Sequence, residues 1–239
     1  MIDKRTLADQ VRSYILDLIK NHRLAPGMEV PSEMRVIQDL GVSRGVVREA
    51  FRSLAALGVL EIASGKRPRI QAVKPDAMET IFSYALATEQ VTPAHVLELR
   101  RALEIGSAAL ASRNGTEEDF SALRIQMEQI RTVFGDHERF IEHDVAFHTI
   151  LAVATKNPMY AMQIQALRAP LETSIRAGLY DERIKRQGAL IIDLHQKITD
   201  AVCSRNEEKA ISAMAAHFDS AVAGLLEKGE CTSKPSPIS

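Results

Sequence analysis

The sequence predicts a mainly α-helical protein, in which a small N-terminal unit of three helices and a two-stranded hairpin precedes an all-α bundle of about seven helices. Three observations support this prediction. Two short helical patterns meet at a Gly-Val-Ser corner within residues 26–51, two β-type segments enclose a turn within 59–73, and from residue 76 apolar residues recur at helical spacing without strand signals. The predicted boundaries are 1–73 for the first domain, 74–77 for a linker, 78–228 for the bundle and 229–239 for a disordered Ser/Pro tail.

The first helix is predicted over Arg5 to Asn21. The second starts after Ser32, whose hydroxyl can accept a hydrogen bond from an amide of the first turn, and it ends at Gly41. Ser43 can cap the third helix. The apolar residues expected on the buried sides are Val11, Ile15, Leu18 and Ile19 in the first helix, Met34, Val36, Ile37 and Leu40 in the second, and Val47, Phe51, Leu54 and Leu57 in the third.

The third helix carries a column of arginines away from its apolar side. Arg44, Arg48 and Arg52 recur four residues apart, so they project from one face toward water or phosphate. A solvated arginine face on an ordinary helix would show the same spacing. Here the two helices and their corner form a helix-turn-helix, which presents its second helix to the major groove of DNA. This context favours DNA binding.

A basic hairpin completes the N-terminal unit. Strands are predicted over Val59 to Ile62 and Ile70 to Val73, with a tight turn between them at 64–69. The turn holds Gly65 and the cations Lys66, Arg67 and Arg69. Such a tip suits contact with the phosphate backbone or the minor groove, although a solvated turn is the alternative.

Seven further helices are expected, near 76–88, 92–112, 116–134, 136–155, 158–178, 181–204 and 207–228. Residues 1–73 carry 12 Lys and Arg against 8 Asp and Glu, whereas 74–239 carry 18 against 23. The near-neutral chain thus combines a basic head with an acidic body.

Membrane insertion and secretion are not expected, because the chain shows no run of about 20 apolar residues and no cleavable leader. Cys203 and Cys231 form no metal or disulfide pattern. Both observations are consistent with a cytoplasmic protein in a reducing compartment.

The bundle contains a candidate metal site. Asp144 and His148 lie four residues apart on one helix, and His195 and His217 lie deep in apolar helices, where an unpaired imidazole is costly. One carboxylate and three imidazoles suit Zn, Ni, Mn or Fe. The alternative is that each histidine is satisfied separately in the core. The sequence places no glutamate base beside this set in the manner of a metalloprotease helix. The remaining histidines, interpreted as surface or structural, are His22, His95, His137 and His143.

The segment from Val11 to Val73 resembles the winged helix-turn-helix of GntR-type bacterial transcription regulators. The resemblance rests on PG followed by PSE, on GVSR with VREA, and on the glycine at the end of the third helix. It implies DNA contacts from Ser43, Arg44, Arg48 and the hairpin glycine, Gly65. Family members usually carry Arg directly after the PSE glutamate, where this chain has Met34. Arg35 is rotated by about 100° around the helix from that position.

Residues from about Val96 to His217 resemble the FCD ligand domain of the FadR-type branch of that family. The matching residues are Glu98, Leu99, Arg100 and Glu104, the stretch from Asp144 to His148, Asn157 and Pro158, and His195, Ala201 and His217. The resemblance implies that Asp144, His148, His195 and His217 are metal ligands, and that Arg100 meets an effector carboxylate. A surface pair of Arg100 or Arg101 with Glu104 or another neighbour is the alternative.

The sequence therefore predicts a DNA-binding repressor that binds a palindromic operator as a homodimer. One divalent metal per chain is expected, with Zn as first choice, and a small organic acid is expected as effector. A metal-dependent enzyme fused to a DNA anchor is the alternative function.

Overall fold

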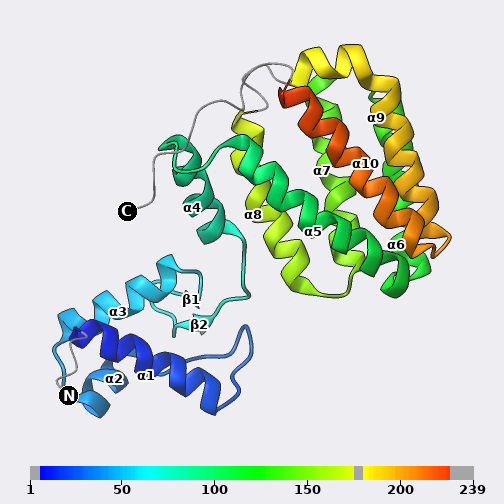
Figure 1. The fold of residues 1–239 in the computed structure, drawn as a ribbon. Coiled ribbons are helices and arrows are strands. Elements are labelled where there is room, and N and C mark those ends of the chain that lie inside the picture. Colours follow the sequence, from blue (N-terminus) through cyan, green and yellow to red (C-terminus); the bar gives the residue numbers. More distant parts are fainter. Residues whose placement is uncertain (1–5, 175–179, 227–239) are drawn as a thin grey trace. The chain divides into compact units, whose positions relative to one another are not determined.

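The computed structural model describes residues 6–174 and 180–226. The chain divides into two compact units, Met1–Ala77 and Met78–Ser239. Ten helices and one two-stranded sheet form the described residues, so the prediction of a mainly α-helical fold with a small N-terminal hairpin is confirmed (Figure 1).

The first unit contains three helices and an antiparallel hairpin, as predicted. Their bounds are Leu7–Asn21 for α1, Glu33–Leu40 for α2, Arg44–Ala56 for α3, Leu60–Glu61 for β1 and Arg69–Ile70 for β2. The core of this unit comes from all five elements and from Val30: Val11, Ile15, Val30, Val36, Val47, Ala50, Phe51, Leu54, Leu60 and Ile70.

The corner between α2 and α3 is built from local signals. Ser32 caps α2 by accepting a hydrogen bond from the Arg35 amide at 3.3 Å, and Ser43 caps α3 through the Val46 amide at 3.4 Å. Gly41 ends α2 with a φ of 64°, and its amide donates to the Ile37 carbonyl at 2.9 Å. This left-handed conformation suits glycine, which has no Cβ to clash with the backbone.

Several details of the first unit differ from the prediction. Met34 is 52% exposed and Leu57 is 58% exposed, so neither belongs to the core. Met34 is two residues before the buried Val36, about 200° around α2, and Leu57 caps the end of α3 rather than continuing it.

The hairpin is also shorter than predicted and has an extra partner. The second strand is Arg69–Ile70 rather than 70–73, and Arg69 also forms a β-bridge with Glu29 on its other side. The first helix begins at Leu7, since Thr6 and Asp9 form a capping box.

The second unit consists of the seven expected helices. Their bounds are Asp76–Ala87 for α4, Pro93–Asn114 for α5, Glu117–Thr132 for α6, His137–Ala154 for α7, Pro158–Ser174 for α8, Tyr180–Cys203 for α9 and Glu207–Leu226 for α10. Thr92 and Thr116 start α5 and α6 as N-caps with capping boxes. The predicted helix ends at 178 and 228 and the tail over 229–239 lie outside the described residues. None of the described helices has an apolar stretch long enough to cross a bilayer.

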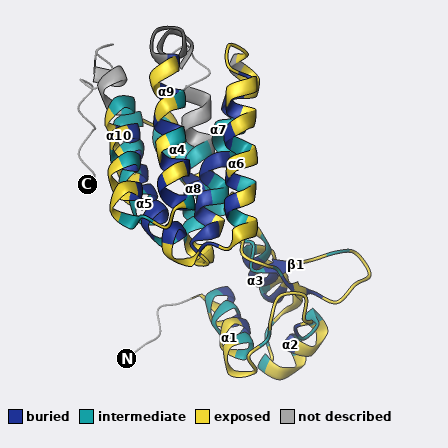
Figure 2. Cartoon of the chain, turned by 90° about the vertical axis from the view of Figure 1, so that its right-hand side faces the viewer, coloured by how far each residue is buried: buried dark blue, intermediate teal, exposed yellow. Residues whose placement is uncertain are grey.

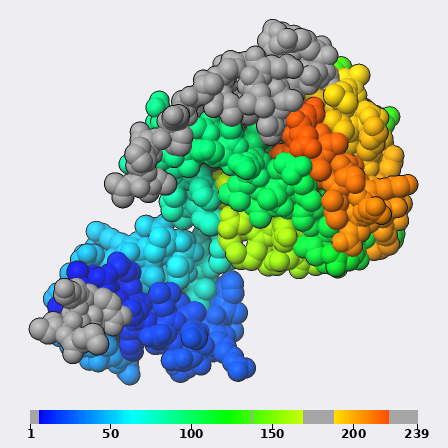
Figure 3. Space-filling view, in the orientation of Figure 1, coloured from blue at the N-terminus to red at the C-terminus, as the bar shows by residue number. Residues whose placement is uncertain are grey.

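Helix α5 is central in the bundle, where it packs against α7, α8, α9 and α10. In Figure 3 the green atoms of α5 lie between the yellow-green atoms of α8 and the orange atoms of α10. The buried residues of the helices face one another and the exposed ones line the outside (Figure 2).

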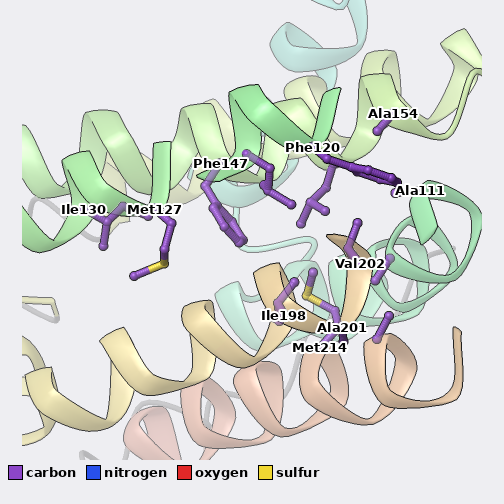
Figure 4. Close-up of a cluster of buried hydrophobic side chains, with 14 of the residues drawn as sticks. Ala111, Phe120, Met127, Ile130, Phe147, Ala154, Ile198, Ala201, Val202 and Met214 are labelled. Carbon is purple, nitrogen blue, oxygen red and sulfur yellow. The ribbon is translucent and has the colours of Figure 1, made fainter. Parts of the chain in front are cut away.

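An apolar core joins α6, α7, α9 and α10. Phe147 points from α7 into the space above Ile198 on α9 and Met214 on α10, and the Phe120 ring of α6 lies beside Ala111 (Figure 4); all five residues are fully buried. Truncation of a buried phenylalanine to alanine typically lowers the free energy of unfolding by about 3–5 kcal/mol. This core fixes the helices that carry the candidate metal ligands.

Two glycines near the corner should respond oppositely to a methyl group. Gly41→Ala should destabilise the end of α2 by about 1–2 kcal/mol, because an L side chain is strained at its positive φ. Gly45→Ala, the matched control inside α3, should stabilise α3 by about 0.5–1 kcal/mol, since the nearest atom to its new Cβ is Ser43 Oγ at 3.9 Å. Amide hydrogen exchange of α2 and α3 measures the two changes. Equal protection in the two variants would contradict this account.

Candidate nucleic-acid interface and metal centre

The arginine column of α3 lies on the surface of the first unit. Arg44, Arg48 and Arg52 are exposed, while Val47 and Phe51 on the other side of the helix are fully buried. The apolar side therefore fixes the helix, and the arginines extend into solvent. Ser43, also exposed, uses its hydroxyl to cap the helix.

The hairpin tip combines cations with a counter-charge that sequence reasoning missed. Gly65 has a φ of 72°, and Lys66 and Arg67 are exposed. Arg69 donates to Glu29 Oε1 at 2.9 Å and to the Gly27 carbonyl at 3.1 Å, and Arg67 Nη1 lies 3.5 Å from Glu29 Oε2. Arg69 is thus tied to the neighbouring chain segment. In the sequence, Glu29 is a single glutamate shortly before the PSE motif, and nothing there indicates that it pairs with the hairpin arginines.

Arg35, the residue after Met34, is paired on its own helix. Its Nε lies 2.9 Å from Asp39 on its own helix, and the Tyr14 hydroxyl donates to the same carboxylate at 3.3 Å. Met34 is exposed in the first turn of α2, beside the exposed Arg35. Position 34 therefore presents an apolar side chain to solvent.

In the second unit, the four predicted metal ligands come together from three helices. Asp144 and His148 lie on α7, His195 on α9 and His217 on α10. Candidate ligand atoms of the three imidazoles lie within 4.8 Å of one another, and all three side chains are buried. Asp144 Oδ1 lies 3.0 Å from His195 Nε2 and 3.9 Å from His148 Nε2.

Two of these imidazoles have an acceptor on both sides. His195 Nδ1 lies 2.8 Å from the Ile191 carbonyl, and His148 Nδ1 contacts Glu104 Oε2, while the Nε2 atoms of both rings face Asp144. A neutral imidazole has one N–H only, so each Nε2 lone pair points toward a carboxylate oxygen. Such an arrangement needs a cation in between. Either protons or a shared metal ion can supply it.

The donor set fits a metal ion. Two buried imidazolium ions side by side would repel each other and would be costly to desolvate, whereas one divalent ion satisfies all the lone pairs. Ligand atoms about 2.0–2.2 Å from a tetrahedral zinc are about 3.3 Å apart, close to the 3.0 Å between Asp144 and His195. The Nδ1 bonds also hold the two rings with Nε2 toward the centre.

The carboxylate of Asp144 stays ionised in this setting. Burial works to raise its pKa, but where protons rather than a metal ion lie between these groups, the hydrogen bond from His195 and the charges of His148, His195 and His217 outweigh burial and hold the pKa well below its ordinary range. An ionised carboxylate among imidazoles is the chemistry that a divalent ion prefers.

A buried pair on α5 extends the site. Arg100 donates from Nε at 2.9 Å and from Nη2 at 2.5 Å to Glu104 Oε1, and the other oxygen of Glu104 contacts His148. A glutamate therefore lies beside His148, but it comes from α5 and not from a helix that carries the histidines. Arg100 and Glu104 are both buried, so the alternative of a surface pair does not hold for them. Arg101, the next residue, forms the surface pair instead, with Asp219 at 2.8 Å.

The carboxylate of Glu104 is held in its ionised form. Burial would raise its pKa, but the charges of Arg100 and His148 and their hydrogen bonds lower it below the ordinary value. Sequence reasoning missed its position because only the packing of α5 against α7 brings Glu104 to His148. A periodic signal existed, since Arg100, Glu104 and Ser107 share one buried face of α5.

Each of the two units matches a known protein family. Residues 7–70 match the family described as "Bacterial regulatory proteins, gntR family", and residues 95–220 match the FCD domain. The uncharacterized regulator YcbG of Bacillus subtilis (strain 168) is 32% identical over 233 residues, covering 95% of each chain. LutR of the same organism is 29% identical over 205 residues, covering 84% of this chain and 93% of its own.

The transcriptional repressor NanR of Salmonella schwarzengrund is 27% identical over 235 residues, covering 97% of this chain and 89% of its own. Among solved structures, a GntR protein of Streptococcus agalactiae has a similar fold, with a TM-score of 0.64 and 23% identity over 90% of this chain and 99% of that one.

Members of this family bind DNA and usually act as dimers, and their FCD domain is a metal-binding effector domain. The family consists of transcription regulators, which leaves the enzyme alternative without support. The chain therefore belongs to the GntR family of bacterial regulatory proteins, carries an FCD domain, and is a sequence-specific DNA-binding transcription regulator rather than an enzyme.

Proposed function

We propose that the protein is a cytoplasmic repressor that binds a palindromic operator as a homodimer and is controlled by a small carboxylate bound at a metal ion in the bundle. The observation that supports a metal ion in the bundle is that both ring nitrogens of His148 and of His195 face an oxygen acceptor. Repression is favoured by the likeness to NanR, whose name describes a repressor.

The DNA half rests on the exposed basic surface of the first unit. Successive arginines of α3 are four residues apart, about 6 Å along the helix axis, which is close to two base-pair steps of about 3.4 Å in DNA. One winged helix reads few bases, so useful specificity needs two heads on a two-fold site. The proposed contact residues are Ser43, Arg44, Arg48, Arg52, Gly65, Lys66 and Arg67.

The metal half assigns one divalent ion per chain to Asp144, His148, His195 and His217. Imidazole and carboxylate ligands suit zinc first, with nickel, manganese or iron as alternatives. Four protein ligands fill a tetrahedral shell, so an effector oxygen needs a fifth or sixth position. When bound, the ion supplies a Lewis acid for a carboxylate.

The effector half assigns Arg100 to the same carboxylate. Its Nε and Nη2 bind Glu104, so the Nη1 end of the guanidinium fork is the end that can meet an anion. Ser107 Oγ is buried on the same face of α5 and has no hydrogen-bond partner among the described residues. A hydroxyl donor or acceptor on the ligand would satisfy it, which favours a hydroxy acid or sugar acid.

DNA binding should depend on two kinds of cation. Arg44→Ala or Arg48→Ala should weaken operator binding by about 1–3 kcal/mol and relax the preference at one base pair, as expected for a base contact. Lys66→Ala should weaken binding to all sequences and flatten its salt dependence. Arg131→Ala, an exposed arginine of the bundle, is the control. Fluorescence anisotropy with operator and scrambled DNA measures these effects, and unchanged operator affinity in both α3 variants would refute the interface.

Purified protein should contain about one divalent ion per chain. A His195→Ala, His217→Ala double variant should lose it, since the remaining ligands cannot complete the shell. His143→Ala is a matched control on α7, because its Nδ1 lies 2.8 Å from Gln126 rather than at the centre. Affinity should fall as the pH is lowered, because protons compete for the imidazoles. Elemental analysis that finds equal metal in all three proteins would reject the site.

Loss of Arg100 should separate sensing from DNA binding. Arg100→Ala should retain its metal at saturating zinc and bind operator, yet lose the response to effector, whereas Arg101→Ala should respond normally. A thermal-shift screen of hydroxy acids, sugar acids and dicarboxylates identifies the effector, since a ligand at 100 times its Kd adds about 2.7 kcal/mol. By linkage, effector affinity should then differ by about 5–150-fold with and without operator. Identical affinities would show that the bundle is not the sensor.

A further inference from the structure

We infer that Glu104 is a positioning residue that fixes the metal ligand His148 and the effector-binding Arg100 together, and so links metal binding to anion binding. This inference rests on the proposed function, because it concerns the same centre. It assigns a role to a side chain that is neither a metal ligand nor an anion donor.

The two oxygens of Glu104 serve different partners. Oε1 accepts both hydrogen bonds from Arg100, at 2.9 Å from Nε and 2.5 Å from Nη2, while Oε2 contacts His148 Nδ1. The Glu104 side chain is 1% exposed, so water does not compete for either oxygen. A single carboxylate therefore bridges two groups on different helices, α5 and α7.

The contact with His148 sets the orientation of a metal ligand. A carboxylate that accepts the Nδ1 proton keeps Nε2 as the lone pair and makes the imidazole a better ligand. The backbone carbonyl of Ile191 has the same role for His195. The difference is that a backbone carbonyl is fixed by its helix, whereas Glu104 is held by a second side chain, Arg100.

The contact with Arg100 sets the orientation of the proposed anion donor. The guanidinium is held on its Nε side by Glu104, and its Cζ lies 5.6 Å from the ring centre of Phe218. Phe218 follows His217 in α10, and its ring lies edge-on to His148 at 6.1 Å. The arginine is thus held beside the histidines by two neighbours.

Glu104 also sets the charge that an effector meets. Arg100 and a divalent ion together bring three positive charges, and the carboxylates of Asp144 and Glu104 bring two negative ones. With neutral imidazoles, the metal-loaded centre therefore has a net charge of plus one. This balance favours a ligand that presents one carboxylate to the centre, because a second buried anion would have no partner.

Zinc affinity tests the bridge directly. Glu104→Gln keeps the size but offers one acceptor oxygen in place of two, so it cannot accept from both Arg100 and His148. Full-length protein should bind zinc about 10–100-fold more weakly, measured by competition with a chelator. Its cobalt-loaded form should show an altered visible spectrum. Glu104→Asp, which keeps the charge but is one methylene shorter, should also lose affinity.

Two further variants separate bridging from a general structural role. Glu207→Gln removes a carboxylate from another pair between α10 and α5, with Arg113 at 3.0 Å, and should leave zinc affinity and the cobalt spectrum unchanged. Arg100→Gln should weaken zinc binding by a few-fold, because Glu104 then loses its anchor. The Arg100→Gln, Glu104→Gln double variant should bind zinc no more weakly than Glu104→Gln alone.

The outcomes distinguish this inference from the proposed function. Wild-type protein that binds no zinc would overturn both. Tight wild-type binding with the same affinity and cobalt spectrum in Glu104→Gln and Glu104→Asp would overturn the bridge alone, even if their metal-free melting temperatures fall. Losses that multiply in the double variant would show that Arg100 and Glu104 act independently, which would also overturn the link.

Discussion

Three helices of the bundle meet around charges that an apolar core cannot solvate. The guanidinium of Arg100, the carboxylates of Glu104 and Asp144, and the imidazoles of His148 and His195 form a continuous series of contacts from α5 through α7 to α9. Each member is stable in the interior only because its neighbours are in place. The surrounding core from α6, α7, α9 and α10 has to hold these helices in register.

This constraint is consistent with the difference in packing between the charged centre and helix α4. Helix α4 has no buried residue, and Phe82 and Leu86 only partly cover Val96 and Leu167. Near the charges, by contrast, Ser107, Glu104 and Thr199 are all buried. Among the described residues, most buried polar groups lie where α5, α7, α9 and α10 pack around these charges, and Ser112 and Thr155 are buried elsewhere.

Features with a local cause could be predicted from the sequence, and features that depend on long-range packing could not. The corner at Gly41 and Ser43 is encoded by capping residues, and the pairing of Asp144 with His148 follows from a spacing of four on a helix. Glu104 was not assigned to the centre, because its contact with His148 requires α5 to lie against α7. Recognising the family supplied the histidines of α9 and α10 as one set, which spacing alone left open.

The pairing of Glu29 with the hairpin arginines changes what DNA would meet at this edge of the first unit. Binding to a polyanion gains free energy when condensed ions leave the phosphates, and the gain scales with the number of phosphates that protein cations neutralise. Arg69, and to a lesser degree Arg67, already has a carboxylate neighbour in the protein, so its approach to phosphate brings Glu29 along. The hairpin therefore has a modest net positive charge. Of its cations, Lys66 is the one that would chiefly neutralise phosphates and release their condensed ions.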